Sequence, residues 1–274
     1  MRVAALQFDV RRGASVENLA VVENGLRTAA RSGVEVVVLP EMWASGFPGP
    51  HSDLAGLVES DARSWEHVAE LSCELGLAVA GSAFGAAAGE LPRNRARLFE
   101  RGALAIEHDK VHLFSPTAET ESFSAGELPL RGVDLRGTRV GLAICYDLRF
   151  PELTHSAFLD GVEVLCASAQ WPLARAPHWR ALVTGLAVQN QCFVVACNRT
   201  GTDVIGRREL VLEFPGNSLV VSPHGEVLAE GRADDRLVVA ELDIALAREL
   251  RRRVPVERDR RPGLYARWNP RETP

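Results

Sequence analysis

The sequence contains no apolar run of the length that a membrane-spanning helix needs, which is about 20 residues. It also lacks an excess of basic residues, since 31 Lys and Arg stand against 36 Asp and Glu and the formal net charge is −5. Such a chain has no basic field for nucleic acid or anionic lipid, so we expect neither nucleic acid nor a membrane as a partner. The opening residues, MRVAALQFDV, do not have the layout of a signal peptide, which predicts a cytoplasmic protein.

Cysteines are few, five in 274 residues, and no two of them form a Cys-x-x-Cys pair. Their odd number and wide spacing argue against a disulfide framework and against a zinc ribbon. We therefore expect no metal and no cofactor. Cys73, Cys166, Cys192 and Cys197 have apolar neighbours and are predicted to be buried. Cys145 is different because it ends a predicted strand.

Strand-like and helix-like segments alternate through most of the chain, with no repeat and no long linker. The predicted strands are 2–10, 34–39, 78–83, 95–100, 104–108, 139–145, 162–167, 193–197, 218–222, 227–229 and 237–243. The predicted helices are 15–32, 62–75, 151–159, 177–191 and 245–252. This alternation predicts a single α/β domain over residues 1–274. Its basic, proline-containing tail, from about 253 to 274, is predicted to be extended.

Three chemically useful side chains lie at the ends of predicted strands. Glu41 follows the run VEVVVLP, Lys110 follows ALAIEHD, and Cys145 follows RVGLAI. Catalytic groups gather at strand ends in α/β folds, because the loops there vary without disturbing the core.

The three side chains together suit the hydrolysis of an amide. A deprotonated Cys145 is a strong nucleophile for a weakly electrophilic amide carbon. The Lys110 ammonium is expected to lower the pKa of the thiol and to stabilise the oxyanion of the tetrahedral intermediate. Glu41 can accept the thiol proton, protonate the leaving amine and then activate the water that cleaves the thioester.

The segments around these residues resemble the three signatures of the nitrilase, or carbon–nitrogen hydrolase, superfamily. They read LPEMW, HDKVHLF and GLAICYDLRFPEL, and they occur in the family's order. The resemblance continues through HWRALVTGLAVQNQCFVVACNRTG to RDRRPGLY. It implies a four-layer αββα sandwich, in which two buried mixed sheets are flanked by helices. It also implies a homodimer or a higher homo-oligomer.

The resemblance implies further site residues. Family members often carry a second glutamate after the lysine, and FSPTAETESF places Glu119 there, with Glu121 as the alternative if the register shifts. The family's oxyanion hole pairs the lysine with the backbone N–H that follows the nucleophile, here that of Tyr146.

The resemblance also narrows the substrate. The run Cys-Tyr-Asp favours amides over nitriles, and CYDLRFPEL, QWPLARAPHW and NRTG are most similar to omega-amidases, which hydrolyse the terminal amide of 2-oxo acids. A carboxylate-bearing amide needs a cation in the pocket, and Arg149 is the first candidate and Arg175 the second. Arg149 has an alternative role as an ion-pair partner of Asp147 or Glu152. The same mechanism on N-carbamoyl amino acids, deaminated glutathione or a nitrile is the alternative activity, and a non-enzymatic binding protein is a third possibility.

Aromatic and histidine residues complete the expected site. Trp43, Phe47 and Trp171 are predicted to form an apolar wall that keeps water out. His112 is the alternative base, and His108 with His112 and Asp147 matches no known metal-site spacing. The charged, bulky stretch VIGRRELVLEFPGNS departs from the family pattern, which predicts a different pocket rim.

Overall fold

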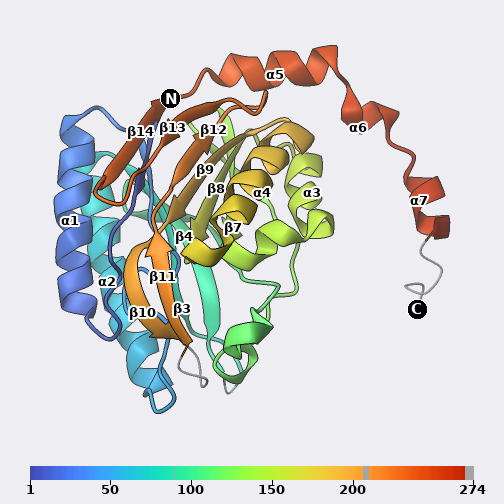
Figure 1. The fold of residues 1–274 in the computed structure, drawn as a ribbon. Helices are drawn as coiled ribbons and strands as arrows, with labels where there is room; N and C mark the ends of the chain where they lie inside the picture. Colours follow the sequence, from blue (N-terminus) through green and yellow to red (C-terminus); the bar gives the residue numbers. More distant parts are fainter. Residues whose placement is uncertain (90, 206–209, 269–274) are drawn as a thin grey trace.

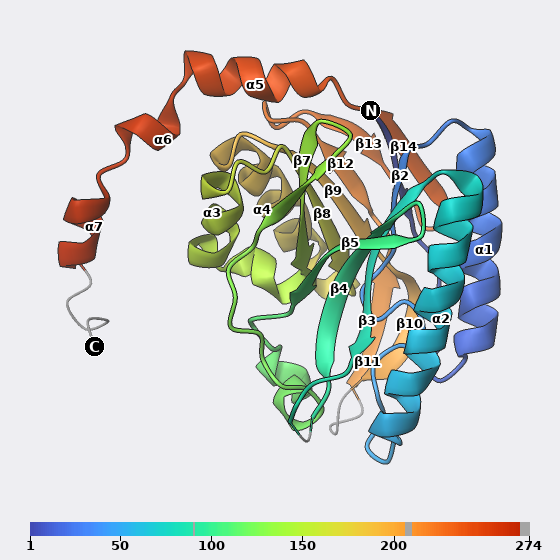
Figure 2. The same ribbon diagram turned by 180° about the vertical axis from the view of Figure 1, so that it is seen from behind.

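The fold consists of four layers, with two six-stranded sheets face to face and helices over both outer faces (Figures 1 and 2). The structure is a computed structural model that describes residues 1–274 except 90, 206–209 and 269–274. The predicted αββα sandwich is therefore confirmed.

The first sheet has the strand order β14-β1-β2-β3-β4-β5. Strands β1, β2 and β3 are parallel, whereas β14, β4 and β5 pair with their neighbours in antiparallel fashion. The bounds are β1 Arg2–Leu6, β2 Val36–Val38, β3 Ala78–Gly85, β4 Arg93–Glu100, β5 Ala103–Asp109 and β14 Leu237–Glu241.

The second sheet has the strand order β13-β12-β9-β8-β7-β6. Strands β7, β8 and β9 are parallel, whereas β6 pairs with β7, β12 with β9 and β13 with β12 in antiparallel fashion. The bounds are β6 Gly132–Leu135, β7 Thr138–Ile144, β8 Val164–Ala169, β9 Phe193–Asn198, β12 Leu219–Val221 and β13 Val227–Glu230. Both sheets are thus mixed, as predicted.

Strands that are apolar on both faces explain the inner layers. In β1, Val3 and Ala5 belong to the core between the sheets, whereas Ala4 and Leu6 belong to the core under the first pair of helices. Successive side chains of a strand point to opposite faces, so a strand covered on both sides must be apolar throughout. The run VEVVVL has this character because its strand is central.

Two pairs of helices form the outer layers. Helices α1 (Ser15–Arg31) and α2 (Leu54–Leu75) cover the first sheet, and α3 (Pro151–Leu159) and α4 (Ala176–Gln189) cover the second. Helix α2 begins eight residues before the predicted position, because the Asp53 side chain caps it by accepting a hydrogen bond from the Gly56 N–H at 3.1 Å.

The cysteines follow their predictions with one exception. Cys73, in the last turn of α2, is exposed, so the prediction that it is buried is wrong. Cys145, Cys166, Cys192 and Cys197 are buried.

A two-stranded hairpin stands apart from the sheets. It pairs β10 (Thr200–Ile205) with β11 (Leu210–Pro215), and the sequence patterns did not predict either strand. The end of β10 and all of β11 fall in the stretch that departs from the family pattern.

The predicted extended tail is wrong in its local conformation. After α5 (Ile244–Arg253), the chain forms the short helices α6 (Val256–Asp259) and α7 (Pro262–Trp268), which lead away from the sandwich (Figure 1). Pro262 is the first residue of α7, where its fixed φ and missing N–H suit a helix start. Residues 269–274 lie outside the described residues. Among the helices described, none is both long and apolar enough to span a bilayer.

Candidate active site

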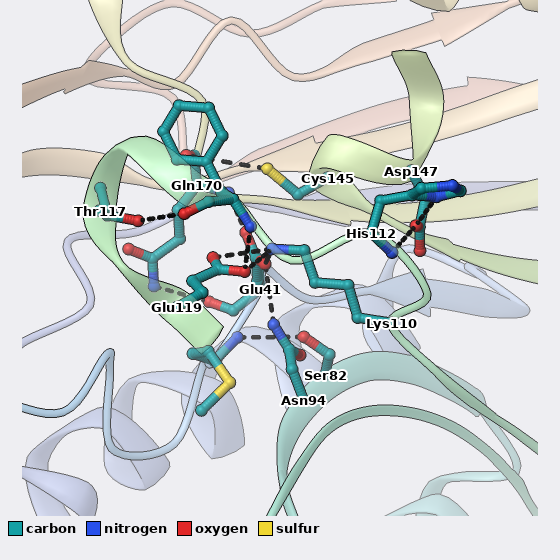
Figure 3. A network of polar contacts seen from close by, with 12 residues as sticks. Glu41, Ser82, Asn94, Lys110, His112, Thr117, Glu119, Cys145, Asp147 and Gln170 are labelled. Carbon is teal, nitrogen blue, oxygen red and sulfur yellow. Dashed lines mark hydrogen bonds and ion pairs between the residues drawn. The ribbon is translucent and has the colours of Figure 1, made fainter. Parts of the chain in front are cut away.

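The ends of strands from both sheets meet at one place. Glu41 follows β2 and Lys110 follows β5 in the first sheet. Cys145 follows β7 and Gln170 follows β8 in the second. Because the sheets lie face to face, these four side chains converge between them (Figure 3).

Lys110 donates hydrogen bonds to two buried carboxylates. Its ammonium donates to Glu41 Oε1 at 2.8 Å and to both oxygens of Glu119 at 2.8 Å. The exposed fractions are 1% for Lys110, 1% for Glu41 and 5% for Glu119. Glu119 also accepts from the Phe114 N–H at 2.8 Å, which fixes its orientation. The expected second glutamate therefore contacts Lys110, whereas Glu121 is exposed.

The buried charges hold one another in place. Burial alone would lower the pKa of Lys110, but the carboxylates of Glu119 and Glu41 outweigh it and leave that pKa raised. Burial raises the pKa of Glu119, and Glu41 adds to the rise, while Lys110 opposes it. Lys110 is thus a permanent cation at neutral pH.

Cys145 starts the short 3-10 helix η3 (Cys145–Arg149) with a strained backbone, at φ 42°. Its thiol donates to the Gln170 carbonyl at 3.9 Å. Burial and then the negative charge of Glu41 raise the pKa of Cys145 well above its usual value, and Lys110 only opposes this. The ammonium lowers the thiol pKa as expected, but burial and Glu41 outweigh it, so the resting group is a neutral thiol.

Asn94 and Gln170 hold the Glu41 carboxylate, and the sequence analysis missed both. Asn94 Nδ2 donates to Oε1 at 2.9 Å, and the Gln170 N–H donates to Oε2 at 3.0 Å. The Gln170 carboxamide also donates to the Glu41 carbonyl at 2.8 Å. A signal existed for Asn94, because its position two residues before Ala96 places it on the same buried face of β4 as Ala96 and Leu98.

A pocket opens directly beside Glu41 and Cys145. Besides Glu119, five other predicted residues line it: Phe47, Tyr146, Arg149, Trp171 and Arg175. Glu119 and Gln170 also reach its wall.

Trp43 is not part of the pocket wall, which corrects the sequence prediction. Its ring packs edge-on against Trp65 of α2, with the ring centroids 5.2 Å apart, in the core beneath the outer helices. A side-chain carbon on Gly81 would lie 2.9 Å from the Trp43 ring, so the glycine leaves room for the indole. Trp43 thus supports the loop after Glu41 from behind.

Both predicted arginines rest on aromatic rings of the pocket. The Arg149 guanidinium lies 4.8 Å from the Trp171 ring centre and donates to His178 Nδ1 at 3.1 Å. The Arg175 guanidinium lies 5.6 Å from the Phe114 ring centre. Within the described residues, no carboxylate pairs with either guanidinium, so the alternative role of Arg149 as a partner of Asp147 or Glu152 is wrong.

His112 is turned away from the thiol. Its Nδ1 lies 2.9 Å from Asp147 Oδ1, and its ring stacks on Phe150 at 3.5 Å. The buried Asp147 also accepts the His112 N–H at 2.8 Å, so it ties the segment after Lys110 to the turn that carries Cys145. In the part of the chain that the structure describes, no group of His, Cys, Asp or Glu could hold a metal ion.

Asp61 anchors the loop that follows Glu41. The Ser45 hydroxyl donates to one of its oxygens and the Phe84 N–H donates to the other at 2.9 Å. Burial raises the pKa of Asp61 to about 6, and these hydrogen bonds oppose the rise.

Replacing Asp61 with Asn is expected to remove a pH dependence of stability. The folded pKa lies above the usual aspartate pKa of 3.8, so the stabilisation from Asp61 is complete below that value and is lost as pH rises through about 6. We expect the free energy of unfolding of wild type, relative to Asp61→Asn, to fall by about 3 kcal/mol between acidic and mildly alkaline pH. Urea unfolding at pH 4 and pH 7.5 measures this. An equal change in the free energy of unfolding of wild type and Asp61→Asn between the two pH values would contradict this prediction.

Known proteins are similar to this chain in sequence. Residues 2–252 match the family model of carbon-nitrogen hydrolases. A 2-oxoglutaramate amidase of Bacillus subtilis (strain 168) is 35% identical over 270 residues, which cover 96% of this chain and 98% of that protein. Omega-amidase YafV of Escherichia coli (strain K12) is 35% identical over 230 residues, which cover 83% of this chain and 85% of that protein.

A solved structure agrees in fold. The carbon-nitrogen hydrolase from Helicobacter pylori G27 superposes with a TM-score of 0.90 at 24% identity, over 98% of this chain and 97% of that one. The family match spans nearly the whole chain, and the relatives align over most of their length. The chain therefore belongs to the carbon–nitrogen hydrolase family, as an enzyme that hydrolyses carbon–nitrogen bonds.

Proposed function

We propose that this enzyme hydrolyses the terminal amide of a small 2-oxo acid through a thioester on Cys145 and releases ammonia. The observation that carries the proposal is that Cys145 and Glu41 line one pocket while Lys110 donates to Glu41 beside it. The pocket wall also holds two arginines without carboxylate partners among the described residues. The names of the amidase relatives support the same substrate class.

The first half of the reaction forms the thioester. Glu41 accepts the thiol proton as the sulfur attacks the amide carbon, which matches a nucleophile that rests as a neutral thiol. The developing oxyanion is stabilised by Lys110 and by the N–H of Tyr146, which lies in the first turn of η3 and has no partner within that helix. Glu41 then gives the proton to the nitrogen, the carbon–nitrogen bond breaks and ammonia leaves.

The second half regenerates the enzyme. Glu41 takes a proton from water as the water oxygen attacks the thioester carbon, and Lys110 again stabilises the oxyanion. The carbon–sulfur bond breaks, the sulfur recovers the proton and the carboxylic acid leaves. Glu119 holds two of the Lys110 hydrogen-bond contacts, so the ammonium stays charged and aimed through both halves.

The carboxylate end of the substrate pairs with arginine. The planar guanidinium of Arg149 can bind a carboxylate with two hydrogen bonds, and its stacking on Trp171 holds it in one orientation. Arg175 faces the same pocket from the opposite aromatic ring, Phe114. A neutral amide would use neither charge.

A panel of substrates tests the proposed class. Ammonia release is measured from 2-oxoglutaramate, an N-carbamoyl amino acid, deaminated glutathione, a neutral amide and a nitrile. Highest kcat/KM with the 2-oxo acid amide supports the proposal. A higher kcat/KM with another substrate of the panel would assign the same mechanism to that substrate class. No ammonia release from any of the five substrates would favour the alternative that the protein is a non-enzymatic binding protein.

Replacing Arg149 with Met is expected to raise the KM for 2-oxoglutaramate. Loss of a charge-assisted contact is worth about 1.5–3 kcal/mol, or roughly 10- to 100-fold in affinity. The KM for a neutral amide should stay within about twofold, because that substrate has no carboxylate. Arg180→Met is the matched control, since Arg180 lies on α4 and pairs with the exposed Glu230. Equal changes in KM for both substrates would refute carboxylate recognition by Arg149.

A further inference from the structure

Arg199 is a buried cation that the proposed reaction does not use. It follows β9 and is 1% exposed. Its guanidinium donates to Gln170 Oε1 at 3.1 Å, to Asp203 Oδ2 at 3.1 Å and to Asp9 Oδ1 at 2.9 Å. It also lies 4.7 Å from the ring centre of Phe214. A charge with this many directed contacts is fixed in position. A shift of one of its partners would therefore move the guanidinium and, with it, the other partners.

One set of these contacts leads to the catalytic base. Because Gln170 Oε1 accepts from Arg199, the amide nitrogen of Gln170 must face the other way, where it donates to the Glu41 carbonyl at 2.8 Å. The backbone N–H of Gln170 holds Glu41 Oε2, and its carbonyl accepts from the Cys145 thiol. The orientation of Gln170, and with it the place of Glu41, depends on Arg199.

The other set leads to the hairpin. Asp203 lies on β10 and Phe214 on β11. Arg199 therefore contacts both strands of the hairpin, through a hydrogen bond to Asp203 and through the ring of Phe214. The same hairpin supplies Ile205 and Leu212 to the pocket wall. Neither Asp203 nor Phe214 lines the pocket itself.

We propose that Arg199 is a positioning residue that joins the β10–β11 hairpin to Glu41 through Gln170, so that the pocket wall and the catalytic base move as one unit. The inference rests on the proposed function only in giving Glu41 the role of base for Cys145. It makes the hairpin a part of the catalytic apparatus as well as a part of the pocket rim.

Asp203→Asn is the sharpest test, because Asp203 touches neither the substrate pocket nor Glu41. Two rates are measured: kcat for the amide that the panel selects, and the rate of alkylation of Cys145 by iodoacetamide as a function of pH. Both are expected to fall about three- to tenfold, since a weakened hold on Arg199 loosens the base that accepts the thiol proton. Arg199→Met should lower both by about tenfold or more.

Arg251→Met is the matched control. Arg251 is a half-buried arginine that, like Arg199, donates several hydrogen bonds and lies near an aromatic ring. It donates to the carbonyls of Gly161 and Asn190 and lies 5.4 Å from the Phe158 ring centre, away from the site. The variant Arg251→Met should lower the melting temperature. It should leave kcat and the alkylation rate of Cys145, each per folded molecule, unchanged.

The proposal is overturned if Asp203→Asn and Arg199→Met change only stability, as Arg251→Met does. Arg199→Lys restores the charge with fewer donors, so it should recover part of both rates. The alkylation rate does not depend on the identity of the substrate. An enzyme that fails on 2-oxo acid amides but shows slower alkylation in Asp203→Asn would therefore refute the substrate class and retain the coupling.

Discussion

Cys145→Ala is expected to abolish amide hydrolysis while the protein stays folded. In the proposed reaction Cys145 supplies the sulfur that forms the thioester. Losing the nucleophile from a set that acts as a unit costs on the order of 10⁵-fold or more in kcat. The alanine keeps the same Cβ at the same strained backbone, and it removes only a thiol that burial holds in the neutral form. The melting temperature should therefore change by only a few degrees. Ammonia release and a thermal melt measure the two quantities.

Cys73→Ala is the control for this variant. Cys73 is exposed on α2, outside the pocket, so its replacement should leave activity unchanged.

Acid-quenched wild type should also carry the mass of the acyl group on Cys145, as seen by intact mass spectrometry. Turnover by Cys145→Ala above about 1% of wild type would refute covalent catalysis by this residue.

Lys110→Met is expected to have the second largest effect, on both rate and stability. Loss of one oxyanion donor typically costs about 10²–10³ in kcat. The same change leaves Glu41 and Glu119 buried without their cation, and breaking a buried ion pair in this way costs about 3–5 kcal/mol of stability. A raw loss of activity would therefore mix two causes.

A second substitution separates the two causes. In the double variant Lys110→Met with Glu119→Gln, one of the two uncompensated carboxylates is removed, so much of the stability should return. Activity should not return, because the cation at the oxyanion is still missing. The single variant Glu119→Gln is the control, because it shows what the glutamine side chain at position 119 does to activity and stability by itself. Recovery of kcat to within tenfold of wild type in the double variant would refute the role of Lys110 as oxyanion donor.

The sequence predicted the central part of the fold because that part depends on burial. Runs such as VEVVVL and RVGLAI admit few structures other than a strand covered on both faces. The four-layer arrangement came from the family resemblance. The hairpin β10–β11 was missed because its residues are partly exposed and charged, and the early start of α2 depends on one cap at Asp53.

The site was predictable where a residue follows a strand and carries reactive chemistry. Glu41, Lys110, Cys145 and Glu119 meet as expected, but Asn94, Gln170 and Arg199 gain their roles from partners distant in the sequence. The protonation state of Cys145 could not be predicted either, because it depends on how burial and two opposite charges balance. The homodimer and the cytoplasmic location stay predictions.

The origin of the site from two separate sheets makes catalysis sensitive to their alignment. One layer brings the acid–base group and the cation, and the other brings the sulfur. A relative slip of about 1 Å would leave every strand hydrogen-bonded within its own layer, yet a misplacement of that size can cost on the order of 100-fold in rate. Mild heat or denaturant should therefore abolish activity before the secondary structure unfolds. Mutations anywhere in the packing between the two sheets can lower kcat even when they lie far from the site.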